Sequence, residues 1–433
     1  MTDLLKMPKY EAYKDSGVEW LNNIPEHWEL IRMKYLYQDT SIKNYPTATL
    51  LSVTQDKGVV PRSWVETRMV MPSGNLESFK YIKEGDFAIS LRSFEGGLEY
   101  CHHDGIISPA YTVLKAKRSD LVKGYYKYLF KSQTFISELQ TSVVGIREGK
   151  NISYEELQYS LLPIPKPEEQ SLIANFLDKK TAQIDEAVAI KKQQVELLKE
   201  RKKVIIQQAV IRGLSPVVTM KDSGINWVDK IPSNWDVIRF KNLFTQSRLP
   251  VRKGDGVVTS FRDGQVTLRS NRRLTGFTEA VIEGGYQGIQ KGQLVLNSMD
   301  AFEGAIGVSD SDGKCTPEYV ICDPKANNVS QHYFAYLLRE MALAKYIQVI
   351  CNAVRQRAVR IRFNNLATRF MVVPPLEEQE KIVQHIQNES KKIDSGIAHL
   401  RSQIEKFKEY KTTLINSAVT GEIKVPLSQD NQE

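Results

Sequence analysis

Four arginines lie close together in the stretch VRQRAVRIRF: Arg355, Arg357, Arg360 and Arg362. The guanidinium group is a planar fork that can bond in pairs to phosphate oxygens, or to O6 and N7 of guanine. This stretch is the densest basic cluster in the chain. It therefore predicts a surface that contacts a polyanion, and nucleic acid is the polyanion that matches this chemistry best.

Thinner basic segments elsewhere in the chain add further candidates for the same chemistry. The stretch GIREGKNIS contributes Arg147, Lys150 and Asn151. The stretches TLRSNRRL and SLRSFEGG contribute Arg269, Arg272, Arg273, Arg92 and Ser93. For each of these residues the alternative is an ordinary solvated surface position. Where contact does occur, we expect phosphate contacts more than base contacts, because most protein–DNA hydrogen bonds go to the backbone.

The overall composition agrees with a folded, basic protein. The chain has 433 residues and a formal net charge of +8, with 41% hydrophobic and 25% charged residues. This length predicts two to three domains, and the charge favours a polyanionic partner without establishing one. The four cysteines show no CxxC spacing, and no signal-peptide or membrane-spanning pattern is found. These features predict a cytoplasmic protein.

The motifs of an enzyme that would itself cut, methylate or translocate DNA are missing. The string FEGG at Phe94 weakly resembles part of a methionine-cofactor site, but the DPPY or NPPY string that grips a base is absent. No PD dipeptide precedes a D/E-x-K triplet, and no GxxxxGK[ST] phosphate loop occurs. The string CHHD at Cys101 has metal-capable side chains, but its spacing does not fit a ligand set. No metal site is expected.

The elements that must position the basic residues come in two copies. KDSGVEW and IPEHW, from Lys14, return as KDSGINW and IPSNW from Lys221, which is a shift of 207 residues. SFEGG and YYKYLF in the first half match AFEGA and YFAYLL at a shift of 208. PEEQ at Pro167 matches LEEQ at Leu376 at a shift of 209. A repeat this regular predicts two copies of one structural unit.

Each copy divides into a globular part and a helical part. The first part contains short β-rich runs such as DFAISL and QLVLNS, separated by Gly and Asp turns, which predicts a mixed α/β globule. The second part follows a pair of prolines and predicts a long helix, because it lacks proline for some forty residues and is rich in helix formers. Paired glutamates after the prolines favour the positive end of the helix dipole, and Gly213 and Gly421 predict the far ends.

Aromatic residues at helical spacing in the two globules are predicted to be core residues. Tyr125, Tyr126 and Tyr128 in the first copy correspond to Tyr333, Phe334 and Tyr336 in the second. Such residues could stack on bases, but their spacing beside leucines favours burial. The four tryptophans of the repeated openings, Trp20, Trp28, Trp227 and Trp235, are expected to anchor the start of each globule.

Both predicted helices carry an apolar seam in 3,4 spacing, which is typical of a coiled coil. The seam residues are Ile184, Val188, Val195, Leu198 and Ile205 in the first helix, and Ile393, Ile397, Leu400, Ile404, Phe407 and Leu414 in the second. Core packing or pairing between separate chains would also use such a seam. Pairing within the chain is favoured, because two equivalent helices in one polypeptide have a high effective concentration for each other.

Two α/β globules alternating with two long helices, each helix entered through PKPEEQ or PPLEEQ, resemble the specificity subunit of a type I restriction-modification system. The repeated tryptophan openings and the FEGG and SPAY strings carry the resemblance further. It implies an α/β fold with two mixed α/β target recognition domains separated by two long antiparallel coiled-coil helices, in a pseudo-two-fold internal repeat. The expected boundaries are target recognition domain 1 at 1–162, spacer helix 1 at 163–213, target recognition domain 2 at 214–373, spacer helix 2 at 374–421 and a tail at 422–433.

The resemblance implies a non-catalytic subunit that binds double-stranded DNA. Each globule would read one half of a bipartite, asymmetric target, and the paired helices would set the distance between the halves. The expected partners are two methyltransferase subunits and, through them, two restriction subunits. No cofactor is expected in this chain, whereas the complex would use S-adenosylmethionine, with ATP and Mg for restriction. The alternatives are an enzyme that cleaves or methylates DNA by itself, and a coiled-coil adaptor that does not read DNA.

Overall fold

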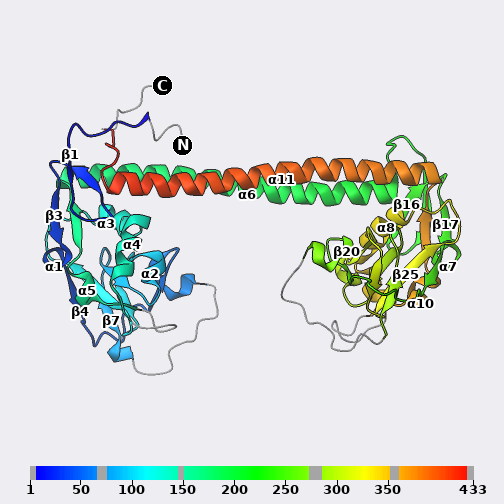
Figure 1. The fold of residues 1–433 in the computed structure, drawn as a ribbon, viewed down its shortest axis with the longest axis horizontal. Coiled ribbons are helices and arrows are strands. Elements are labelled where there is room, and N and C mark those ends of the chain that lie inside the picture. Colours follow the sequence, from blue (N-terminus) through cyan, green and yellow to red (C-terminus); the bar gives the residue numbers. More distant parts are fainter. Residues whose placement is uncertain (1–5, 66–75, 145–150, 273–284, 352–359, 427–433) are drawn as a thin grey trace. The chain divides into compact units, whose positions relative to one another are not determined.

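The computed structural model of the chain describes residues 6–65, 76–144, 151–272, 285–351 and 360–426. Two helices dominate it: α6, Pro167–Arg212, and α11, Leu376–Val419 (Figure 1). The chain divides into two compact units, and the division falls within both helices. Unit 1 contains residues 1–192 and 401–433, and unit 2 contains residues 193–400. Each unit therefore combines one globule with the beginning of one long helix and the end of the other.

Unit 1 is a mixed α/β globule. Its strands are β1 Tyr13–Asp15, β2 Asn23–Pro25, β3 Glu29–Arg32, β4 Tyr37–Thr40, β5 Leu51–Thr54, β6 Gly58–Pro61, β7 Lys80–Ile82, β8 Phe87–Ile89, β9 Glu99–Tyr100, β10 Gly105–Ile107, β11 Thr112–Ala116, β12 Val143–Val144, β13 Asn151–Ile152 and β14 Leu161–Ile164. Its short helices are α1 Met33–Leu36, α2 Ser93–Gly96, α3 Lys123–Leu129, α4 Gln133–Thr141 and α5 Tyr154–Leu157, with 3-10 turns η2 Arg62–Trp64 and η3 Leu76–Ser78.

Unit 2 repeats this arrangement with other side chains. Its strands are β15 Met220–Ile225, β16 Val228–Pro232, β17 Asp236–Arg239, β18 Phe244–Ser247, β19 Val258–Ser260, β20 Val266–Leu268, β21 Gln287–Ile289, β22 Leu294–Asn297, β23 Ile306–Val308, β24 Gly313–Cys315, β25 Tyr319–Pro324 and β26 Phe370–Val373. Its helices are α7 Phe240–Leu243, α8 Gln331–Leu343, α9 Tyr346–Ile350 and α10 Phe363–Ala367, with 3-10 turns η5 Arg269–Asn271 and η6 Ala301–Glu303.

The sheet topology confirms the internal repeat, except that the pair β12-β13 of unit 1 has no counterpart among the described strands of unit 2. The central sheet of unit 1 has the antiparallel order β4-β11-β8-β9, and that of unit 2 has the order β18-β25-β22-β23. The smaller pairs match as well, with β14-β3 against β17-β26, and β5-β6 against β19-β20. The β-rich runs predicted from the sequence form β8 and β22, at equivalent places in these sheets.

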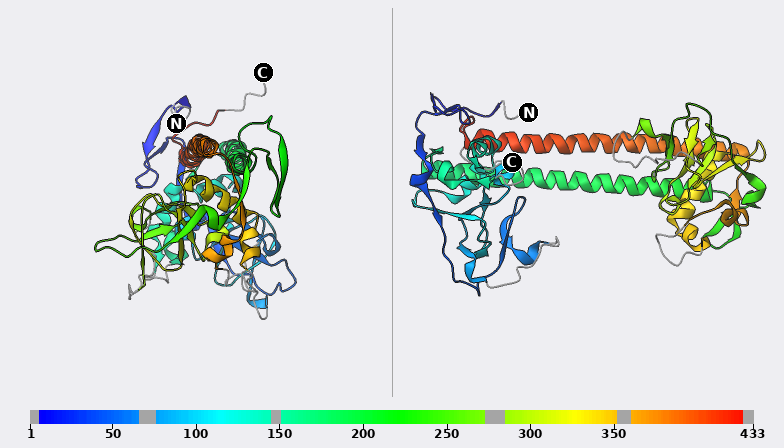
Figure 2. Two further views of the ribbon diagram at one scale, coloured as in Figure 1. Left: turned by 90° about the vertical axis from the view of Figure 1, so that its right-hand side faces the viewer. Right: turned by 60° about the horizontal axis from the view of Figure 1, so that its bottom comes forward.

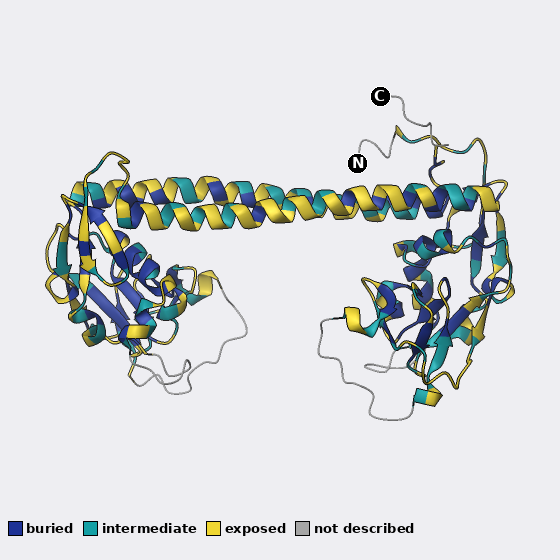
Figure 3. Ribbon diagram, turned by 180° about the vertical axis from the view of Figure 1, so that it is seen from behind, coloured by how far each residue is buried: buried dark blue, intermediate teal, exposed yellow. Residues whose placement is uncertain are grey.

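Each globule has its own hydrophobic core, which includes residues of both long helices. In unit 1, Trp28 and Tyr125 are fully buried in a cluster that also contains Leu414 of α11. In unit 2, Trp235 and Tyr333 occupy a cluster that also contains Val210 of α6. The aromatic residues predicted to be core are buried or packed against the core, so that prediction is confirmed. The burial pattern along the strands and helices is visible in Figure 3.

Candidate nucleic-acid interface and the anchors that position it

A buried glutamine fixes the start of α6 to the globule of unit 1. Gln170 has an exposed fraction of 0%. Its side-chain oxygen accepts a hydrogen bond from Val122 N at 2.8 Å, and its Nε2 donates to Pro165 O at 2.8 Å and to Asp120 O at 3.3 Å. One amide thus satisfies backbone groups on both sides of the helix start, in the segment before α6 and in the loop before α3.

The second copy of the motif does the same at the start of α11. Gln379 is also 0% exposed, accepts from Ser330 N at 2.9 Å, and donates to Pro374 O at 2.8 Å and to Asn328 O at 3.2 Å. Sequence reasoning assigned a role to the glutamates of the EEQ strings and missed the glutamine. The signal that could have found it is the presence of the same glutamine in both copies.

The glutamate before each glutamine binds the opening segment of its globule. Glu169 accepts a hydrogen bond from Tyr10 Oη at 2.6 Å and lies 2.9 Å from His27 Nε2. In unit 2, Glu378 accepts from Trp235 Nε1 at 3.0 Å. Burial raises the pKa of the Tyr10 hydroxyl, and the bond to Glu169 raises it further because it stabilises the neutral phenol. These glutamates therefore add side-chain contacts to the helix-dipole role predicted for them.

A buried tyrosine in each unit holds the end of the long helix that comes from the other half of the sequence. Tyr125 donates from Oη to Val419 O of α11 at 2.7 Å, and Tyr333 donates to Val210 O of α6 at 3.0 Å. Both tyrosines are fully buried, which raises the pKa of each hydroxyl well above its usual value. The predicted helix ends are confirmed, since Gly213 and Gly421 follow with φ of 74° and 80°.

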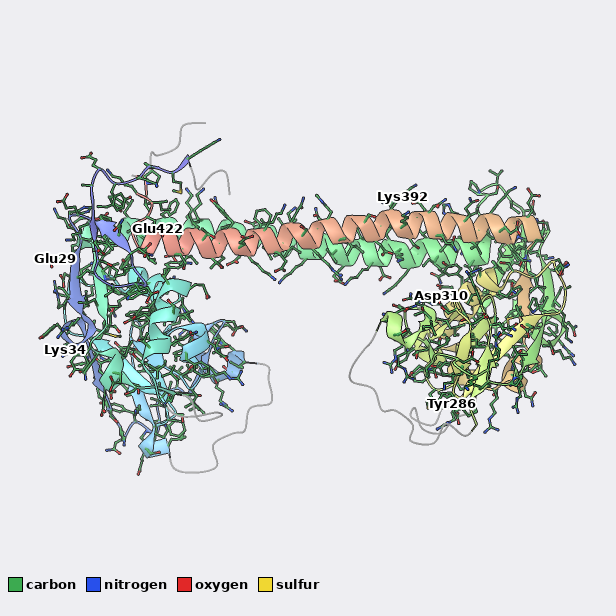
Figure 4. All side chains as sticks on the ribbon, viewed as in Figure 1. Glu29, Lys34, Tyr286, Asp310, Lys392 and Glu422 are labelled. Atoms are coloured by element: carbon green, nitrogen blue, oxygen red, sulfur yellow. The ribbon has the colours of Figure 1, made fainter. Side chains whose placement is uncertain are left out.

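The predicted apolar seam is confirmed in both units. In unit 2, Val195 of α6 and Ile393 and Ile397 of α11 are buried, and Leu198, Ile205 and Leu400 pack against them. In unit 1, Ile184 and Leu414 are buried, and Val188 and Phe407 pack against the same cluster. Ile404 is 6% exposed. Figure 2 shows the two helices side by side, and Figure 4 shows side chains such as Lys392 projecting outward.

Ion pairs cross between the helices at two equivalent places and show that the helices run antiparallel. In unit 1, Lys411 Nζ lies 2.6 Å from an oxygen of Asp185, and in unit 2 Lys202 Nζ lies 2.7 Å from an oxygen of Asp394. Both lysines are at corresponding heptad steps, where the long side chain reaches across to the partner helix. The pairs are partly exposed, so each contributes about 0.2–1 kcal/mol.

The residues predicted to bind DNA differ in their solvent exposure. Arg92 is exposed at the start of α2. Ser93 is 0% exposed and its Oγ accepts from Ser90 N at 2.8 Å, so the prediction that Ser93 contacts DNA does not fit its buried position. Asn151, in β13, is half-buried and pairs with Val144.

The candidates of unit 2 are at or near the surface. Arg269 is half-buried in η5, and its Nε donates to Thr259 Oγ1 at 3.3 Å. Arg272 is exposed, bonds both oxygens of Asp263 at 2.8 and 2.9 Å, and lies 4.1 Å from the centre of the Phe261 ring. Two further arginines, Arg360 and Arg362, are exposed, and Arg360 pairs with Glu318 at 2.5 Å.

Five of the predicted DNA-binding residues lie outside the described residues: Arg147, Lys150, Arg273, Arg355 and Arg357. An arginine that sequence reasoning missed, Arg62, lies in η2 at the place in unit 1 that Arg269 occupies in unit 2. Arg92 precedes α2 where unit 2 has Asp300 before η6, which agrees with the shift of 208 residues between SFEGG and AFEGA.

Groups that could support metal or thiol chemistry are not assembled within the described part of the chain. No group of three or more His, Cys, Asp or Glu side chains there could hold a metal ion. Cys101, in the CHHD string, is buried, and its burial raises the pKa of the thiol to about 12. Among the described residues, no helix combines the length and apolar character that a membrane span requires.

The fold and the buried hydrogen-bonding residues Gln170, Tyr125, Gln379 and Tyr333 define the class of protein. It consists of two copies of one α/β unit, and each unit binds the start of one long helix and the end of the other. No family model matches the sequence. Curated relatives of the chain include the type I restriction enzyme EcoBI specificity subunit of Escherichia coli, 20% identical over 83% of this chain and 78% of the relative. The MjaVIII specificity subunit of Methanocaldococcus jannaschii is 22% identical over 96% of this chain and 98% of the relative.

Solved structures show the same fold. The HsdS subunit from Thermoanaerobacter tengcongensis matches with a TM-score of 0.55 and 15% identity, over 94% of this chain and all of that one. A chain from a study of complex assembly and conformational transition of the type I R-M system matches with a TM-score of 0.67 and 14% identity, over 92% and 99%. The predicted fold and the predicted resemblance to type I specificity subunits are confirmed, and neither alternative function is favoured.

Proposed function

We propose that this chain is the DNA-reading specificity subunit of a type I restriction-modification complex. The observation that carries this proposal is the match of almost the whole chain to specificity subunits, together with a duplicated fold. Unit 1 reads one half of a bipartite DNA target and unit 2 reads the other half. Because the two units differ in sequence, the two half-sites differ, and the target is not a palindrome.

The paired helices set the spacing of the half-sites in this proposal. Two related readers can meet one face of DNA when their half-sites lie about 10 bp, one helical turn, or a multiple apart. The buried glutamines and tyrosines support this role, because each unit binds both helices through hydrogen bonds made by fully buried side chains. Buried bonds of this kind hold an element in one orientation better than exposed contacts do.

The chain itself is non-catalytic and acts through its partners, in the cytoplasm. Two methyltransferase subunits bind it and supply S-adenosylmethionine-dependent adenine methylation. Two restriction subunits add ATP- and Mg-dependent cleavage. The relatives support this assignment, because each is named as a specificity subunit. The missing nuclease, methylase and phosphate-loop motifs in the sequence support it as well.

The decisive experiment maps methylated adenines in DNA from cells that produce this chain with the methyltransferase encoded beside it. The expected result is one asymmetric, bipartite motif with a fixed spacer. Replacing unit 1 by that of another specificity subunit should change one half of the motif and leave the other half and the spacer unchanged. Methylation without a bipartite motif, or methylation by this chain alone, would refute the proposal.

Salt dependence separates DNA reading from the adaptor alternative. The affinity of a DNA reader for duplex DNA falls steeply with salt, with a logarithmic slope close to 0.9 times the number of phosphate contacts. An adaptor that does not read DNA shows no such slope. The measurement is fluorescence anisotropy of a labelled duplex carrying the mapped motif, titrated with the assembled complex at several salt concentrations.

A further inference from the structure

A short 3-10 turn follows the same hairpin in both units. In unit 1 the hairpin β5–β6 leads into η2, and Arg62 N donates to Leu50 O at 3.0 Å. In unit 2 the hairpin β19–β20 leads into η5, and Arg269 N donates to Val257 O at 2.8 Å. These backbone bonds seat the two arginines at equivalent places, although the surrounding side chains differ. The hairpin of unit 2 is marked by β20 in Figure 1.

The two turns share their first two residues and differ in the third. Their sequences are Arg-Ser-Trp in η2 and Arg-Ser-Asn in η5. Trp64 is 56% exposed, and its ring meets that of His103 edge-on with the centres 4.9 Å apart. Asn271 is also exposed, and its Nδ2 donates to Thr267 Oγ1 at 2.9 Å. The third position thus presents a large aromatic surface in one unit and a small amide in the other.

The shared arginine fits a contact that does not depend on base sequence. The Nε of Arg269 donates to Thr259 Oγ1 at 3.3 Å, and a guanidinium group is suited to bonding phosphate oxygens because it carries five N–H donors in a planar fork. Two readers of different half-sites meet the same sugar-phosphate backbone. An arginine at the same place in both units is therefore expected to bind the sugar-phosphate backbone, which both half-sites share.

The divergent third residue fits a contact that distinguishes bases. Asparagine can bond the edge of adenine, and a carboxamide oxygen can accept from an exocyclic amino group. An exposed tryptophan offers apolar contact and one N–H donor instead. Aromatic surface next to positive charge is a recurring feature of nucleic-acid sites, and Trp64 lies in the same turn as Arg62.

We propose that Arg62 and Arg269 bind equivalent DNA phosphates in the two half-sites, and that Trp64 and Asn271 beside them contact bases and make the two half-sites different. This inference rests on the proposed function. The same turn has the same role in both units. Its arginine binds the DNA backbone, and its third residue determines which bases are recognised.

The test measures binding of the assembled complex to two labelled duplexes, one with the mapped motif and one unrelated. Arg62→Ala and Arg269→Ala should each weaken binding to both duplexes and reduce the logarithmic salt slope by about 1. Arg62→Lys keeps the charge and should retain the slope, which separates loss of a phosphate contact from loss of folding. Tyr159→Ala is the matched control, because this aromatic residue of unit 1 is 53% exposed and lies outside the turn.

The specificity arm compares duplexes altered in one half-site at a time. Trp64→Ala should change discrimination in the half-site of unit 1 by roughly 5- to 100-fold, the range for a good base contact, and leave the other half unchanged. Asn271→Ala should do the converse. Unchanged salt slopes for both arginine variants, or equal effects of Trp64→Ala on both halves, would overturn the inference. If wild type shows no motif-specific binding, the proposed function fails; if wild type binds specifically and the variants behave like Tyr159→Ala, only this inference fails.

Discussion

Replacing the buried glutamine at the start of a long helix tests how the units hold the helices. In Gln170→Ala, three hydrogen bonds disappear: the bond from Val122 N and the bonds to Pro165 O and Asp120 O. Gln170 is 0% exposed and its bond to Pro165 O is buried, whereas its bonds with Val122 N and Asp120 O are partly buried. An orphaned buried polar group costs about 1–3 kcal/mol, and partial entry of water lowers the total. We expect unit 1 to lose about 2–4 kcal/mol of stability.

The sequence offers matched variants with which Gln170→Ala can be compared. Gln379→Ala removes the equivalent three bonds in unit 2, so it should destabilise that unit by a similar amount. Glu168→Ala changes an exposed residue two positions before Gln170, and only a dipole contribution below about 1 kcal/mol is expected from it. The comparison of these variants separates loss of the buried amide from any change near a helix start.

The assay is hydrogen exchange of the intact chain, read by mass spectrometry on peptides, together with urea unfolding. Gln170→Ala should speed exchange in the peptide that contains Val122, and Gln379→Ala in the peptide that contains Ser330, each without changing the other unit. Unchanged exchange at both places, or an unfolding midpoint no lower than that of Glu168→Ala, would refute the reasoning that these glutamines anchor the helices.

Three further predictions concern the seam, the cross-helix pairs and pH. Leu198→Asp places a charge at the apolar seam and should lower stability by several kcal/mol. Leu197→Asp, at a side chain that is 63% exposed, should change stability by less than about 0.5 kcal/mol. Equal unfolding midpoints of the two variants in urea would contradict the packing of Leu198 in the seam. Exchanging Lys411 and Asp185 for each other should restore most of a loss of at most about 1 kcal/mol caused by either single reversal, as a double-mutant cycle can show. Burial raises the pKa of Glu99 to about 7 from an ordinary 4.5, so between these pH values the native state binds a proton that the unfolded state does not, and the contribution of Glu99 to stability falls as pH rises from about 4.5 to 7. Glu99→Gln should therefore flatten the pH dependence of the melting temperature in that range. An unaltered pH profile would contradict the raised pKa of Glu99.

The repeated local patterns predicted most of the fold because they act over short distances in the chain. Proline and glycine restrict or extend the backbone at their own positions, so Pro167 begins α6 and Gly213 and Gly421 follow the helix ends with positive φ. The 3,4 spacing of apolar residues places them on one helix face, whatever the partner is, and the seam is buried as predicted. Repetition of these signals in both halves predicted two equivalent units.

The contacts between distant segments required the tertiary structure. Nothing in the local pattern around Gln170 or Tyr125 indicates which backbone groups they bind, because those groups lie 48 and 294 residues away in the chain. Equivalent places in the two units are set by the hairpin and its backbone bonds, which match Arg269 with Arg62.

The sequence by itself thus determined the duplication, the two long helices with their seam, and the aromatic residues of both cores, since each depends on spacing along the chain. Only the tertiary structure decided which side chains bind the long helices, and that Ser93 is buried. Those outcomes depend on hydrogen bonds and packing between segments brought together by folding, and the free energy of such contacts is not encoded in any one stretch of residues.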